Sequence, residues 1–175
     1  MSSADSPRGD PRRLSRRDFV NQFGHVFEES PWIAEAAFDA GLPADAHTAA
    51  GLHRALSAVL RAAPRERQLA LIRAHPDLAG RLARAGTLSR DSTKEQAGAG
   101  LDRLTDGEYR DFTALNAAYR EKFAMPFIMA IKGRRKAEIL AAFEARLSND
   151  EDSEVATALA EIERIALLRL RDLLP

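Results

Sequence analysis

The sequence predicts an all-α fold, a single-domain bundle of roughly eight to ten helices. Apolar residues make up 45% of the chain and charged residues 30%, and the apolar residues recur mainly at helical spacing. Only ten glycines and eight prolines interrupt this pattern in 175 residues. A chain of this length can bury a core of its own and has the usual size of one domain.

Charge and cysteine content exclude several classes of site. The 26 basic residues balance 26 acidic ones, so we expect no nucleic-acid partner and no attraction to an anionic membrane. The absence of cysteine excludes disulfides and thiolate nucleophiles or ligands. No apolar run has the length of a membrane span, and no apolar signal region follows the N-terminal charges, so we expect a cytoplasmic protein.

Nine helices are expected in order along the chain. Each is placed by an apolar stripe at helical spacing, and its ends by capping residues, proline or glycine. Ser15 with Asp18, and Thr105 with Glu108, have the three-residue spacing that is typical of helix N-termini. The expected ranges are about 15–27, 31–40, 45–63, 64–74, 77–85, 92–98, 105–125, 136–147 and 152–174.

The N-terminal residues 1–14 contain Ser, Pro, Gly, Asp and Arg with almost nothing to bury. Such a composition is typical of a disordered tail. The folded domain is therefore expected to occupy residues 15–175.

The segment Phe127–Ile131 is the only apolar run with some strand character. A lone strand has no sheet to join, so we expect an extended, buried connector between two helices. Such a run is more often plain core. Its peptide N–H and C=O groups would nevertheless need partners, and a flat heterocycle rich in donors and acceptors would supply them.

His75 is followed by Pro76, which disfavours helical geometry at the histidine and should hold it on a rigid corner at a helix end. A fixed imidazole that titrates near neutrality is suited to general acid–base catalysis. The simpler alternative is a histidine that only satisfies the last carbonyls of its helix. No two histidines of the chain are four residues apart, so a histidine metal site is not expected.

Ser92 and Glu95 have the spacing of a capping box, in which each side chain bonds the amide of the other residue. The same helix N-terminus would offer its amides and partial positive charge to an anionic ligand. Ser92, Glu95 and Gln96 would then add directional groups, and both roles can hold together.

Arg169 falls on the apolar stripe of the last predicted helix, together with Val155 and Ile162. A buried guanidinium without an anion would be strongly destabilising, so a partner is expected. An internal Asp or Glu and a ligand carboxylate or carbonyl are equally suitable. Arg164 and Arg171 fall on the polar side of the same helix and should be solvated.

These segments carry a resemblance to a known family. The motifs, in order, are AHPDLAG at 74–80, STKEQAGAGL at 92–101, NAAYREKF at 116–123, PFIMAIKG at 126–133 and IALLRL at 165–170. Together they resemble the 2-oxo-4-hydroxy-4-carboxy-5-ureidoimidazoline (OHCU) decarboxylases of urate degradation, from about Phe19 to Leu173. One departure is Ala124-Met125, where a glycine and an aromatic residue are common in the family.

The resemblance implies an all-helical carboxy-lyase, usually a homodimer, that converts OHCU to (S)-allantoin without a metal or organic cofactor. It implies that the small-molecule substrate is a ureidoimidazoline and that His75 and Glu95 are catalytic. The implied substrate-binding residues are Pro76, Ser92, Gln96, Phe127, Ile128, Met129, Ala130, Ile131 and Arg169.

The competing interpretation is a non-catalytic all-helical interaction module. In it, Glu95 is only a helix cap and Arg169 only one member of an internal ion pair. The decarboxylase interpretation instead requires the implied catalytic and binding residues to converge on one small cavity.

Overall fold

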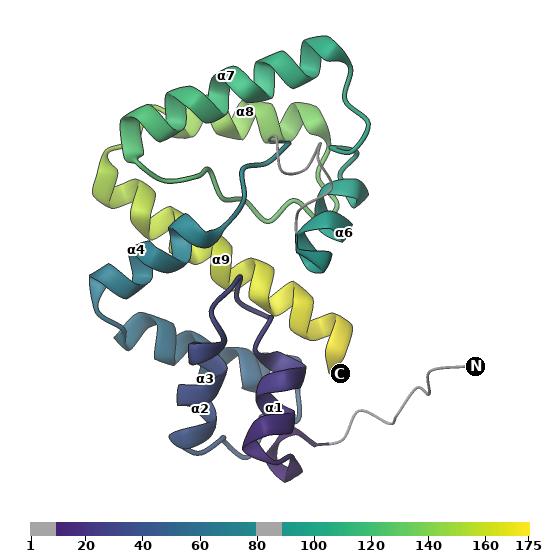
Figure 1. Cartoon of the computed structure of the whole chain (residues 1–175), viewed down its shortest axis with the longest axis vertical. Helices are drawn as coiled ribbons and strands as arrows, with labels where there is room; N and C mark the ends of the chain where they lie inside the picture. Colours follow the sequence, from purple (N-terminus) through teal and green to yellow (C-terminus); the bar gives the residue numbers. More distant parts are fainter. Residues whose placement is uncertain (1–9, 80–88) are drawn as a thin grey trace, which may run out of the picture. The chain divides into compact units, whose positions relative to one another are not determined.

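The computed structural model describes residues 10–79 and 89–175, and the regular structure within these ranges is entirely helical (Figure 1). This confirms the predicted all-α class. The helix expected at 77–85 lies largely outside the described residues. Among the helices in the described ranges, none is long and apolar enough to cross a membrane.

Contacts divide the chain into two compact units. The first contains the chain up to Pro64 together with Ala166–Pro175, and the second contains Arg65–Ile165. The long helix α9 (Glu151–Leu173) contributes residues to both.

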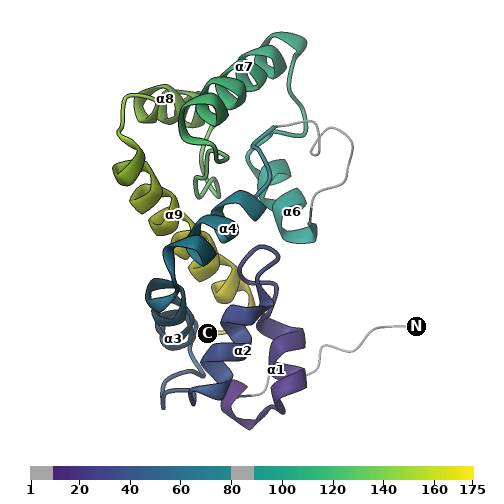
Figure 2. The same ribbon diagram turned by 60° about the vertical axis from the view of Figure 1, so that its left-hand side comes forward.

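In the first unit, α2 packs against both α1 and α3 (Figures 1 and 2). These helices are α1 (Arg16–Phe23), α2 (Pro31–Asp39) and α3 (Ala49–Ala62). As predicted, the Ser15 hydroxyl accepts the N–H of Asp18 at 3.1 Å, and Pro31 occupies the first turn of α2. Phe19 is fully buried in this unit and lies 5.2 Å from Phe38, ring centroid to ring centroid.

The start of the chain differs from the prediction at two places. A short 3-10 helix, η1 (Pro11–Arg13), is capped by Asp10, so ordered structure extends into the segment expected to be a tail. The helix α1 is shorter than its apolar stripe, because it ends at Phe23 while Val26 and Phe27 are buried in the turn that follows. An apolar stripe thus marks burial beyond the helix end as well as within the helix.

The helix α3 begins at Ala49, later than the expected start near Asp45. Its cap is Thr48, whose hydroxyl accepts the N–H of Gly51 at 3.0 Å. The C=O of Asp45 accepts the N–H of Thr48 at 3.0 Å and closes a turn before the helix. The helix therefore begins after Thr48, whose side chain has good N-cap geometry, and not near Asp45.

The second unit contains α4 (Arg65–Ala74), α6 (Arg90–Gly98), α7 (Asp106–Phe123), α8 (Lys136–Arg146) and the first part of α9. The capping box predicted for α7 is present. The N–H of Thr105 donates to Glu108 at 2.8 Å, and the N–H of Glu108 donates to the Thr105 hydroxyl at 3.2 Å.

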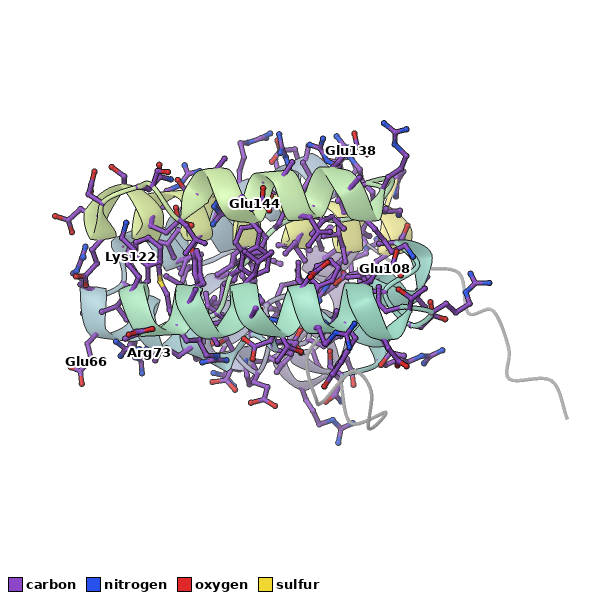
Figure 3. All side chains as sticks on the ribbon, turned by 90° about the horizontal axis from the view of Figure 1, so that it is seen from above. Glu66, Arg73, Glu108, Lys122, Glu138 and Glu144 are labelled. Carbon is purple, nitrogen blue, oxygen red and sulfur yellow. The ribbon has the colours of Figure 1, made fainter. Side chains whose placement is uncertain are left out.

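The helices α7 and α8 lie side by side and run in the same direction (Figures 1 and 3). An ion pair of 2.7 Å between Lys136 and Glu108 joins their first turns, and Lys122 near the end of α7 donates to the C=O of Leu147 just beyond α8. A short turn cannot join parallel neighbours, because the chain must return along about 27 Å of α7. Residues 124–135 make this return without helix or strand, as expected of a connector.

The connector is anchored on aromatic and charged side chains of the second unit. The ring of Phe127 stacks on Phe143 at 3.8 Å and meets Tyr119 edge-on at 5.4 Å. The Tyr119 hydroxyl donates to the fully buried Glu154, which also accepts from Arg146 Nε at 2.7 Å. Burial, and then the hydrogen bond to Glu154, raise the pKa of Tyr119 well above its ordinary value.

Ala124 ends α7 in the left-handed conformation, with φ of 51°. A side chain with a Cβ is strained there, whereas glycine is not. The glycine expected here from the resemblance would adopt this conformation without strain.

Replacing Ala124 by Gly should therefore raise the free energy of unfolding by about 1 kcal/mol, measured by urea denaturation. The matched control is Ala117→Gly at an exposed position inside the same helix. It should lower the same quantity by about 1 kcal/mol. Changes of the same sign in the two variants would contradict the assigned helix end.

Candidate active site

His75 follows the last residue of α4 directly, and its side chain is buried. Its backbone N–H donates to the C=O of Ile72 at 3.2 Å, and its ring Nδ1 lies 2.9 Å from the C=O of Leu71. The helix ends at Ala74, where the effect of Pro76 on the preceding backbone predicts it. The histidine does satisfy a helix-terminal carbonyl, with one of its two ring nitrogens.

The contact with Leu71 fixes the tautomer of His75. A carbonyl oxygen can only accept a hydrogen bond, so Nδ1 carries a proton. In the neutral ring, Nε2 is then the basic atom, and in the protonated ring Nε2–H becomes the second donor. The ring is held in one orientation with Nε2 as its proton-exchanging atom, which suits acid–base chemistry.

The turn that follows His75 is fastened to α6 by the side chain of Gln96. The Gln96 Oε1 accepts the N–H of Ala79 at 2.9 Å, and its Nε2 donates to the C=O of Asp77 at 3.4 Å. Ala79 adopts a left-handed φ of 52°, which is strained for a residue other than glycine. These two bonds bring the His75 segment next to the helix that carries Glu95.

The same turn is also fastened to α7. Asn116 Nδ2 donates to the C=O of Leu78 at 2.9 Å, and Arg120 forms a 2.9 Å ion pair with Asp77. Asn116 is buried, and its Oδ1 has no hydrogen-bond partner among the described residues. The position of His75 thus depends on backbone carbonyls of α4 and on side chains of α6 and α7.

The helix α6 begins earlier than predicted. Its N-cap is Ser89, whose hydroxyl accepts the N–H of Ser92 at 3.2 Å. The capping box predicted for Ser92 and Glu95 is therefore wrong, because Ser89 supplies the cap and both residues lie within the helix. Ser92 and Gln96 are buried one turn apart, and Glu95 is half-buried beside them.

The segment Phe127–Ile131 of the connector is buried as predicted, apart from the half-buried Met129. The C=O of Ile128 accepts from Arg146 Nη1 at 2.6 Å, and the N–H of Ala130 donates to Glu161 Oε2 at 2.7 Å. Within the described ranges, the peptide N–H and C=O groups of Phe127 and Met129 have no hydrogen-bond partner. Buried peptide groups in this state can bind a ligand that offers both donors and acceptors.

Arg169 is buried in the first unit, as the apolar stripe predicts. Its Nη1 lies 3.1 Å from the carboxylate of Glu28 and 3.3 Å from the C=O of Val26. Glu28 is also buried, so the required anion includes an internal carboxylate. Arg164 and Arg171 are exposed, as expected.

The described residues contain no group of three or more histidines and acidic residues that could hold a metal ion. His47 is exposed, with Nδ1 3.1 Å from the C=O of Ala44. His53 lies within α3, where its Nε2 is 3.2 Å from the Ser57 hydroxyl.

Four residues around the candidate site have contacts that the sequence did not indicate: Asn116, Arg120, Arg146 and Glu161. Asn116 carried a usable signal, because it is a polar residue on the buried stripe of α7 beside Phe112 and Tyr119. Arg146 and Glu161 carried none, since charged residues on amphipathic helices are usually solvated.

The chain is similar to known proteins over most of its length. A family model described as OHCU decarboxylase matches residues 12–171. The 2-oxo-4-hydroxy-4-carboxy-5-ureidoimidazoline decarboxylase of Halalkalicoccus jeotgali is 39% identical over 164 residues, covering 94% of this chain and 89% of that protein. The enzyme of the same name from Mus musculus is 38% identical and covers 90% and 86%. A crystal structure of (S)-allantoin synthase superposes with a TM-score of 0.76 and 28% identity, over 97% of this chain and 54% of that one.

The tautomer of His75 can be tested by long-range ¹H–¹⁵N NMR of the histidine rings. Above the pH at which the ring loses its extra proton, we expect the Nδ1–H form, because the Leu71 carbonyl requires a donor at that nitrogen. The resonances are assigned by their loss in His75→Ala. An Nε2–H form would contradict the proposed proton-exchanging atom.

Proposed function

Because the chain belongs to the OHCU decarboxylase family, we propose that it removes CO₂ from 2-oxo-4-hydroxy-4-carboxy-5-ureidoimidazoline to form (S)-allantoin in urate degradation. It is thus a carbon–carbon lyase. The observation that best supports this function is the hydrogen-bonded turn that brings His75, with its oriented ring, next to the helix of Glu95.

The chemistry requires a place for electrons and a source of a proton. Breaking the bond to the carboxylate leaves an electron pair on the ring carbon, and the imidazoline ring of the substrate accepts it. The protein then positions the substrate and supplies the proton. Delivery of the proton to one face of the ring makes a single enantiomer of allantoin.

Two side chains are assigned to the acid–base step. His75 presents Nε2 to the 4-hydroxyl and carboxylate region of the substrate, while its Nδ1 remains bonded to the Leu71 carbonyl. Glu95, half-buried on α6, steers the imidazole. A pair of this kind exchanges protons as a coupled unit.

Substrate binding is assigned to Pro76, to Ser92 and Gln96 on the buried side of α6, to the peptide groups of Phe127–Ile131 and to Arg169. The peptide groups of Phe127 and Met129, which have no partner in the part of the chain that the structure describes, offer both donors and acceptors to the ureido group and the ring oxygens. Arg169 adds a planar cation for a substrate oxygen. Its approach to the same substrate as His75 stays a prediction of the proposal.

The proposal includes three further properties of the working enzyme. The reaction needs no metal or organic cofactor, since the ring of the substrate is the electron acceptor. The active form is a homodimer, and the reaction takes place in the cytoplasm.

The test generates the unstable substrate in situ from urate with the two preceding enzymes and follows optical activity by circular dichroism. Added protein should accelerate the appearance of optically active (S)-allantoin above the slow, racemic background. A racemic product formed at the background rate would contradict the function and favour the non-catalytic interaction module.

In the same assay, His75→Ala should lower the rate on the order of 10²-fold or more, because it removes the acid–base group. His47→Ala is the matched control, since His47 is an exposed histidine whose Nδ1 also lies near a carbonyl. It should retain wild-type activity. Both variants should keep the far-ultraviolet spectrum and melting temperature of the parent, and a folded His75→Ala enzyme with full activity would contradict the assignment.

A further inference from the structure

We propose that Glu161 is a positioning residue, which holds the connector so that the peptide groups of Phe127 and Met129 face the substrate. The inference rests on the proposed function, because it presumes a substrate bound along Phe127–Ile131. Glu161 itself has no contact with the reacting atoms in this proposal.

The carboxylate of Glu161 contacts both the connector and the exposed side chain of Arg164. Its Oε2 accepts the N–H of Ala130 at 2.7 Å, and its Oε1 lies 3.2 Å from Arg164 Nη1. The Glu161 side chain is 18% exposed and that of Arg164 is 58% exposed. A hydrogen bond from a peptide N–H to a mostly buried carboxylate is about twice as strong as a neutral one.

A second charged side chain acts on the connector two residues earlier. Arg146 Nη1 donates to the C=O of Ile128 at 2.6 Å, and its guanidinium lies 4.3 Å from the centre of the Phe127 ring. The anionic Glu161 thus accepts the N–H of Ala130, and the cationic Arg146 donates to the C=O of Ile128, two residues earlier.

This spacing determines which peptide groups remain for a ligand. Residues 127–131 are neither helical nor in a turn. Where such a segment is extended, the peptide groups of residues two apart point to the same edge, and those of the residue between them point to the opposite edge. Glu161 and Arg146 therefore occupy the edge of Ile128 and Ala130. The opposite edge belongs to Phe127 and Met129, whose peptide groups have no partner among the described residues.

Of the two charged residues, Glu161 gives the cleaner test. Arg146 neutralises Glu154, which is fully buried, so removing Arg146 would leave a carboxylate without its countercharge and threaten the fold. The ion-pair partner of Glu161 is the exposed Arg164, which solvent can accommodate when the carboxylate is removed.

The experiment measures kcat and KM for the in situ substrate in variants of the full chain. Glu161→Met keeps the length of the side chain but removes the acceptor for Ala130, so KM should rise about tenfold while kcat changes less than about threefold. The split is expected because the connector binds the ground state and the transition state equally. Glu161→Gln keeps a carbonyl acceptor and should restore KM to within about threefold of the parent.

The matched control is Arg164→Ala, which removes the exposed partner and leaves the bond to Ala130 intact. It should leave KM unchanged. If Glu161→Met does not fold, Glu161→Asp replaces it, because the shorter side chain keeps its charge but cannot reach the connector; its KM should also rise. An unchanged KM in the folded Met or Asp variant, or a glutamine variant as impaired as the methionine one, overturns the proposal.

Amide hydrogen exchange separates this proposal from the proposed function. Exchange at Ala130 should be faster in Glu161→Met than in the parent, whether or not the protein is an enzyme. A parent without decarboxylase activity overturns the proposed function and, with it, the role in substrate binding. An active parent in which the variant leaves both Ala130 exchange and KM unaltered overturns the role of Glu161 alone.

Discussion

The parallel arrangement of α7 and α8 is the constraint on which the second unit depends. It forces residues 124–135 to return along α7 (Figure 3), and residues 125–131 of this return are largely buried, where peptide groups without partners are strongly destabilising. Helices cannot satisfy these groups, because their own backbone bonds are internal, so charged side chains do: Arg146 for Ile128 and Glu161 for Ala130. The buried Glu154 follows from the same constraint, since it neutralises Arg146 and accepts from Tyr119. The same topology leaves the peptide groups of Phe127 and Met129 without partners among the described residues, and in the proposed site these groups bind the substrate.

The histidine is placed by a different device. Proline after His75 ends α4, and side chains of other helices hold the turn at residues 76–79 that follows. The side chains of Gln96 on α6 and Asn116 on α7 form hydrogen bonds with the peptide groups of this turn. Since Gln96 is adjacent to Glu95, one hydrogen-bonded turn couples the positions of the two residues assigned to acid–base work. The strained backbone of Ala79 is consistent with a turn shaped by these partners.

Local sequence patterns predicted most of the fold. The contacts that they did not predict join residues far apart in the sequence. Helix class, the caps of α1 and α7, the buried connector and the burial of Arg169 all follow from spacing, proline and apolar stripes. The predicted start of α6 is wrong because both Ser89 and Ser92 can act as an N-cap, and in the folded chain Ser89 does so. The partners of Ile128 and Ala130 could not be predicted. Arg146 and Glu161 lie 18 and 31 residues away in the sequence, and charged residues on amphipathic helices are usually expected to be solvated. The candidate catalytic residues and Gln96 were identified through family motifs, whereas the contacts of Asn116, Arg120, Arg146 and Glu161 were not.

In the proposed site, the connector binds the ligand through the edge of Phe127 and Met129, close to His75. Titration of ¹⁵N-labelled protein with (S)-allantoin tests it directly, because a new hydrogen bond shifts the amide signal of its donor. We expect large, saturable shifts at the amide of Met129 and at Nε2 of His75, with a small shift at Ala130, whose N–H is already bonded to Glu161. Saturable binding that moved the Ala130 amide and left Met129 and His75 unchanged would contradict it.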